Sequence, residues 1–104
     1  MWKEVIVLKE INLYEGILKS RELDSNEKLV LCTIATYEGK YLSNKFIGSL
    51  ISLTPNCISK IITKLKKGGY VTTSYEEYQY TKKRMIHLTK KTTEMVNEGG
   101  KLNA

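Results

Sequence analysis

Residues 43–71 read SNKFIGSLISLTPNCISKIITKLKKGGYV and decide the fold. Ser43 and Thr54 each precede a run with helical periodicity, and a hydroxyl at that position caps the free N–H groups at a helix start. Pro55 follows the second cap, at the first helical position, where its missing N–H costs nothing. The stretch therefore predicts two short helices joined by a tight turn.

The second of these helices has one apolar and one polar face. The apolar side chains recur at i, i+3, i+4 and i+7, the spacing of a buried helix face: Ile58, Ile61, Ile62 and Leu65. The other face carries Asn56, Ser59, Lys60, Thr63, Lys64 and Lys67. We expect Gly68-Gly69 to end the helix by supplying positive φ.

A further helix is predicted before this pair, and a β-hairpin after it. Asp24 and Glu27 are spaced as a capping box, so a helix should begin there and stop at Gly39. Residues 70–75 and 82–88 are typical of two strands, with 76–79 as a polar tip. Thr89 is placed to cap a last helix that Gly99-Gly100 would end.

The N-terminal segment has a different composition. Residues 1–14 are rich in β-branched and aromatic side chains without a helical stripe, which favours one extended strand or a strand pair. Residues 15–22 are expected to form a short helical turn.

The positive charge is concentrated in the second half of the chain. The 104 residues are 41% hydrophobic and 27% charged, as expected for one globular domain, and carry a formal charge of +6. Residues 1–52 hold seven basic and seven acidic side chains, whereas residues 53–104 hold ten and four. This asymmetry points to a polyanionic partner, the alternative being a solvated lysine-rich face.

Several functional classes lack the residues they need. Cys32 and Cys57 are not spaced as a CxxC pair and only His87 could join them, so no metal site is predicted. With one His, one Asp, no glycine-rich phosphate loop and no nucleophile motif, the chain is expected to be neither an enzyme nor cofactor-dependent. No apolar run nears the roughly 18–20 residues of a membrane span, and residues 1–4 lack the features of a secretory signal, so we expect a cytoplasmic protein without membrane contact.

The order of elements and four local motifs resemble the winged helix-turn-helix family. The motifs are Leu42–Ile47 at the opening of the second helix, Leu53–Ile58 at the turn, Leu65–Val71 at the entry to the wing and Arg84–Thr89 on its return strand, within residues 24–90. Ile47 stands where a small alanine is usual and Ser52 where glycine is frequent, which suggests altered helix packing. Within the family the chain is similar in character to small plasmid and phage proteins: MarR-like regulators, N-terminal domains of replication initiators and relaxosome accessory proteins of the TcpK type.

This resemblance implies an α+β winged helix-turn-helix fold. It would consist of a three-helix core with a C-terminal β-hairpin wing and an extra N-terminal β segment. One domain would fill residues 1–104, with an extension at 1–22, the winged core at 23–90 and a helix and tail at 91–104.

The resemblance also implies sequence-specific binding to double-stranded DNA. Base edges would be read in the major groove from the exposed first turns of the recognition helix, by Asn56, Ser59, Lys60 and Thr63. Phosphate contacts would come from the end of that helix and from the wing, by Lys64, Lys67, Tyr78, Lys82, Lys83 and Arg84. For each group a structural role is the alternative: a solvated face, complementing of the helix dipole, or packing within the hairpin.

Three matters stay open at this point. The apolar side chains of residues 2–8 could pack on the domain's own core, exchange with a second subunit to give a homodimer, or enter a DNA groove themselves. The process could be replication or conjugative transfer at a plasmid or phage origin, which we favour slightly, or transcription regulation. A winged domain that binds proteins instead of DNA is the remaining alternative. No small-molecule ligand is expected.

Overall fold

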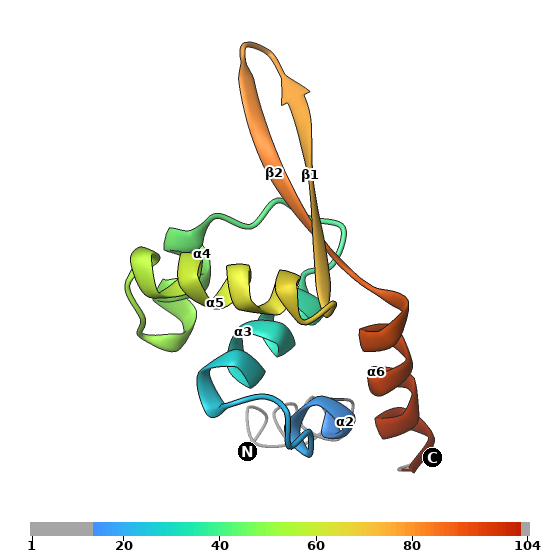
Figure 1. The fold of residues 1–104 in the computed structure, drawn as a ribbon. Coiled ribbons are helices and arrows are strands. Elements are labelled where there is room, and N and C mark those ends of the chain that lie inside the picture. The colour runs from blue at the N-terminus through green and yellow to red at the C-terminus, as the bar shows by residue number, and fades with distance from the viewer. Residues whose placement is uncertain (1–13, 103–104) are drawn as a thin grey trace, which may run out of the picture.

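The computed structural model describes residues 14–102 (Figure 1). The elements in chain order are α2 (Glu15–Leu18), α3 (Ser25–Thr36), α4 (Asn44–Ile51), α5 (Pro55–Lys67), β1 (Val71–Tyr78), β2 (Thr81–Leu88) and α6 (Lys90–Leu102). The helices form one body, from which the β1–β2 hairpin projects as a wing (Figure 1). The predicted α+β winged helix fold is confirmed. The predicted N-terminal strand lies outside the described residues.

Helix α3 begins as the sequence predicts. The Asp24 carboxylate accepts a hydrogen bond from the Glu27 backbone N–H at 2.8 Å, and the Glu27 carboxylate accepts one from the Asp24 N–H at 3.2 Å. The hydrogen bond from the Glu27 backbone lowers the pKa of Asp24 below its ordinary 3.8. The predicted end at Gly39 was wrong: the helix stops at Thr36, and Gly39 lies in the following loop at φ 84°.

Helices α4 and α5 form the helix-turn-helix. They meet at 103° across a break of three residues, within the range usual for this motif. The Ser43 hydroxyl accepts from the Phe46 N–H at 3.0 Å and the Thr54 hydroxyl from the Cys57 N–H at 3.2 Å, so both predicted caps are confirmed. Apart from this bent pair, no single helix in residues 14–102 is long and apolar enough to cross a membrane.

The turn between these helices accommodates Ile47 and Ser52, the two residues that depart from the family pattern. A Cβ at Gly48 would overlap the carbonyl oxygen of Leu53, so the small residue of the turn is Gly48. Ile47 is fully buried in the core. Ser52 takes the left-handed conformation, at φ 60° and ψ 43°, that glycine adopts most easily. The tight turn is therefore built despite the unusual residues.

The core lies between the helices and the base of the hairpin. Its largest fully buried side chains are Ile17, Leu31, Ile34, Ile47, Ile58, Leu65 and Ile86. Helix α2 packs against α6 (Figure 1), so closely that a Cβ at Gly16 would overlap the carbonyl oxygen of Met95. Ile58, Ile62 and Leu65 of the predicted apolar face of α5 are buried, so this face packs the helix against the core.

The wing is longer than predicted, and so is the last helix. The antiparallel register runs from Val71 opposite Leu88 to Tyr78 opposite Thr81. Residues 76–78 belong to β1, so the predicted tip at 76–79 was wrong; the turn is made by Gln79, at φ 50°, and Tyr80. Helix α6 continues through Gly99 and Gly100, which were expected to end it, because neighbouring helical residues can carry glycine at a cost of about 1 kcal/mol each.

Candidate nucleic-acid interface

The polar face of α5 is open to solvent. All six candidate residues on it are exposed: Asn56, Ser59, Lys60, Thr63, Lys64 and Lys67. The buried side chains of the opposite face hold the helix against the core, and Thr54 and Pro55 fix where it begins. The Thr63 hydroxyl donates to the Ser59 carbonyl at 3.0 Å, which leaves the oxygen of that hydroxyl as an acceptor. A rigid helix therefore presents amide, hydroxyl and ammonium groups along one exposed side.

The two ends of α5 differ in charge. Its first turn has no acidic side chain, and its last turn carries Lys64, Lys66 and Lys67. Cations near a helix C-terminus complement the helix dipole, so these lysines stabilise α5 whether or not they also meet phosphate.

Two of the basic side chains of the wing lie opposite acidic ones. The strand register places Glu77 opposite Lys82 and Glu76 opposite Lys83, although no acidic residue is close to these lysines along the chain. Lys83 also lies over the ring of Tyr41, with its Nζ 5.3 Å from the ring centroid. Tyr78 pairs with Thr81 at the end of the hairpin. Lys82 is left as the exposed wing cation closest to the tip.

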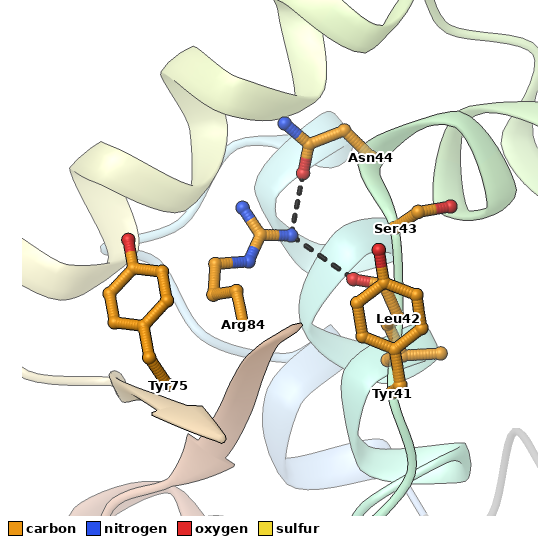
Figure 2. Close-up of a pocket in the computed structure, with 6 residues that line it drawn as sticks. All are labelled: Tyr41, Leu42, Ser43, Asn44, Tyr75 and Arg84. Atoms are coloured by element: carbon orange, nitrogen blue, oxygen red, sulfur yellow. Dashed lines mark hydrogen bonds between the residues drawn. The ribbon is translucent and has the colours of Figure 1, made fainter. Parts of the chain in front are cut away.

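Arg84, a predicted phosphate contact of the wing, lies midway along β2, opposite Tyr75. Its Nη2 donates to the Leu42 carbonyl at 3.1 Å and to the Asn44 side-chain oxygen at 2.7 Å (Figure 2). The two hydrogen bonds join β2 to the start of α4 across 42 and 40 residues of sequence. The sequence analysis did not identify Asn44, because no local sequence pattern indicates a contact between residues so far apart in the chain.

A second polar cluster holds the root of the wing. The Tyr70 hydroxyl donates to the Glu22 carboxylate at 2.6 Å, and Lys91 of α6 lies 3.7 Å from that carboxylate and 4.2 Å from the Tyr70 ring centroid. Burial and then this hydrogen bond raise the pKa of Tyr70 to about 12. The hydrogen bond from Tyr70, followed by the charge of Lys91, lowers the pKa of Glu22.

The two cysteines differ in accessibility. Cys57 is exposed on the first turn of α5, whereas Cys32 is partly buried, and burial raises its thiol pKa to about 11. Within residues 14–102, no three His, Cys, Asp or Glu side chains come together as a metal site would require.

The fold is similar to those of several solved proteins. MepR from S. aureus, a transcription regulator of the multidrug efflux pump MepA, matches with a TM-score of 0.66 at 13% identity, over 97% of this chain and 72% of that one. A DNA complex of S. aureus MepR matches with a TM-score of 0.63 at 10% identity, over 97% and 71%.

Two further solved proteins have the same architecture. MarR from E. coli matches with a TM-score of 0.62 at 14% identity, over 97% of this chain and 73% of that one. The transcriptional regulator PcaV from Streptomyces coelicolor, solved with its natural ligand, matches with a TM-score of 0.61 at 16% identity, over 95% and 67%.

Neither a protein-family model nor a curated protein sequence matches the chain. At identities of 10–16% the likeness to solved structures concerns the fold. The sequence motifs, the 103° helix-turn-helix and the projecting hairpin all agree with it. The chain therefore has the winged helix-turn-helix fold, in the MarR-like form seen in MarR, MepR and PcaV.

Proposed function

We propose that this chain binds double-stranded DNA in a sequence-selective manner and regulates transcription. The observation that carries the proposal is the exposed polar face of α5, held at the end of a helix-turn-helix beside a basic hairpin. Asn56, Ser59, Lys60 and Thr63 would read base edges in the major groove, where amide and ammonium groups distinguish base pairs. Lys64, Lys67, Lys82 and Lys83 would contact phosphates, and Tyr78 would join them from the wing.

The comparisons bear on the choice between transcription and an origin-binding role. MepR and PcaV are described as transcription regulators, and MepR has been solved with DNA. No residue or contact described above favours a role in plasmid replication or conjugation, so transcription regulation becomes the first proposal. PcaV also binds a natural ligand, so a small-molecule effector enters the proposal as a question for experiment.

A homodimer is the proposed assembly. The support comes from the apolar side chains of residues 2–8, which exceed what a winged core of this size needs to bury. A two-fold dimer would read paired half-sites about one DNA turn apart. Light scattering after size exclusion tests this directly: a mass of one chain at micromolar concentration would contradict it.

Fluorescence anisotropy with duplex fragments from the gene's own neighbourhood, and scrambled controls, tests DNA binding. We expect a salt-dependent isotherm with a preference for one fragment, weakened by Asn56→Ala. Arg21→Ala, which removes an exposed cation between α2 and α3, outside α5 and the wing, is the matched control and should leave binding within about twofold. Equal affinity for both fragments would refute selectivity. An absence of binding at low salt would refute the proposal and favour the protein-interaction module.

A further inference from the structure

The middle of the wing and the start of α4 border an open pocket of about 340 Å³. It is lined by Tyr41, Leu42, Ser43, Asn44, Tyr75 and Arg84 (Figure 2). Tyr75 and Arg84 are direct cross-strand partners, so their side chains share one face of the hairpin. The Arg84 guanidinium lies between Tyr75 and the segment that leads into α4 (Figure 2).

No carboxylate described among residues 14–102 forms an ion pair with Arg84. Its two hydrogen bonds go to neutral oxygens, of Leu42 and Asn44, and both use the same nitrogen, Nη2. Its Nε is buried without a hydrogen-bond partner in the described part of the chain, and none of the six described residues that line the pocket carries a carboxylate. A partly buried cation with a free donor is costly unless a charge partner arrives from outside.

The surroundings of the pocket also favour an anion. Ser43 and Asn44 are the N-cap and first residue of α4, whose first turn has no acidic side chain and whose dipole is positive at this end. Lys45 is exposed on the same turn, and the nearest carboxylate along β1, that of Glu76, is one residue beyond Tyr75 and therefore on the opposite face of the hairpin. Tyr41 and Tyr75 are 49% and 68% exposed as residues, and their hydroxyls can add hydrogen-bond donors.

We propose that this pocket holds a phosphate group of the DNA backbone, gripped by Arg84 between the wing and the start of α4. The guanidinium has donors in a planar fork that suits phosphate, and its contacts with Leu42 and Asn44 fix its orientation before the phosphate arrives. The contact sets the position of the duplex while α5 reads the bases. This inference rests on the proposed function and assigns Arg84 to one fixed phosphate instead of a contact made by the wing tip.

Arginine-detected NMR tests the proposal on the unaltered protein. The chain has two arginines, so the Nε–H signal of Arg21, an exposed residue before α3, is an internal reference for that of Arg84. We expect the preferred duplex to shift the Arg84 signal and leave that of Arg21 in place. Duplexes with a single neutral methylphosphonate, placed at each backbone position in turn, should lose this shift at one position per half-site. Binding should weaken there roughly tenfold.

The variants Arg84→Gln and Arg84→Lys complete the test. In Arg84→Gln that same methylphosphonate should have no further effect, and the slope of log K against log salt should fall by about 0.9. Arg84→Lys keeps the charge but not the fork, so it should restore the slope and only part of the affinity. Circular dichroism confirms that each variant is folded before it is compared; an unfolded variant leaves the NMR experiment to decide.

The possible failures are distinguishable. If the duplex binds selectively but the Arg84 signal does not move, the pocket proposal is wrong and the proposed function stands. The same holds if wild type and Arg84→Gln share one methylphosphonate profile. If inorganic phosphate at constant ionic strength shifts the Arg84 signal and the duplex does not, the pocket takes a free anion and the assignment to DNA is overturned. If no duplex binds, the proposed function fails and takes this assignment with it.

Discussion

The helix-turn-helix turn and the wing are held in place by different kinds of contact. At the turn, backbone meets backbone: Gly48 lies against the Leu53 carbonyl, and Ser52 takes a left-handed conformation to close the bend. The wing depends on side-chain contacts: Val71 and Ile86 are buried at its base, and hydrogen bonds come from Tyr70 at its root and from Arg84 midway along β2. Its tip extends away from the helical body (Figure 1).

The difference suggests a proposal in which the two regions have separate tasks. Closely packed backbone segments cannot shift without steric overlap, so the contact at the turn fixes the angle between α4 and α5. The base of the wing is buried at Val71 and Ile86, whereas residues 79–82 at its tip are exposed, so the tip can shift at low cost to follow a DNA backbone. We therefore propose that base readout belongs to the rigid helix-turn-helix and phosphate contact to the wing.

Gly48→Ala attacks the rigid region and should have the largest effect. The added Cβ would overlap the Leu53 carbonyl, so α4 and α5 must separate. We expect a loss of about 1–3 kcal/mol in the free energy of unfolding, measured by urea denaturation. Ser49→Ala, at the exposed neighbouring position, is the control and should stay within about 0.5 kcal/mol. Equal stability of the two variants would show that the turn is not closely packed.

Tyr70→Phe attacks the root of the wing and should cost less, about 0.5–1.5 kcal/mol at pH 7, because it removes one buried hydroxyl and its bond to Glu22. The pKa of Tyr70 is raised to about 12 from an ordinary 10.0, so the neutral hydroxyl stabilises the fold below pH 10. That contribution is lost as the pH rises from 10 toward 12. Urea denaturation at pH 8 and at pH 11 should therefore show the difference between wild type and Tyr70→Phe narrowing at the higher pH. A difference independent of pH would contradict this, and Tyr75→Phe, an exposed tyrosine of the same wing, is the control.

Ser52→Gly tests the turn of the rigid region and should change stability least of the three substitutions. Glycine adopts the left-handed conformation without the penalty that a Cβ incurs, but it also gains freedom in the unfolded chain. We expect a net gain below about 1 kcal/mol in thermal denaturation, with unchanged DNA selectivity. Ser52→Val, which keeps a Cβ and adds branching, should be less stable than wild type. A variant with glycine that is destabilised would mean that the Ser52 side chain has a role that its backbone angles do not reveal.

The sequence predicted what depends on local chemistry and missed what depends on distant contacts. Caps at Asp24, Ser43 and Thr54 and the stripe on α5 follow from neighbouring residues, so the helix starts and the buried face of α5 were predicted correctly. The position of the hairpin turn was wrong because glutamates 76 and 77 are polar, yet their strand pairing with lysines 83 and 82 keeps them in β1.

The candidate site was predicted unevenly for the same reason. The exposed face of α5 could be listed from its period alone. The pocket at Arg84 could not, because it brings Leu42 and Asn44 to a strand some 40 residues later, and only the fold makes that contact. The roles of the α5 and wing residues in DNA binding remain predictions.

One measurement tests the division of tasks most directly: anisotropy titrations with a preferred and a scrambled duplex at several salt concentrations. They compare wild type, Asn56→Ala on α5 and Lys82→Ala/Lys83→Ala on the wing. We predict that Asn56→Ala lowers the ratio of the two affinities by about 1–3 kcal/mol and leaves the salt slope unchanged. The wing variant should weaken both duplexes alike and reduce the slope by about 1 for each lysine that meets a phosphate. If the wing variant loses selectivity while Asn56→Ala keeps it, α5 is not the reading element and the account is contradicted.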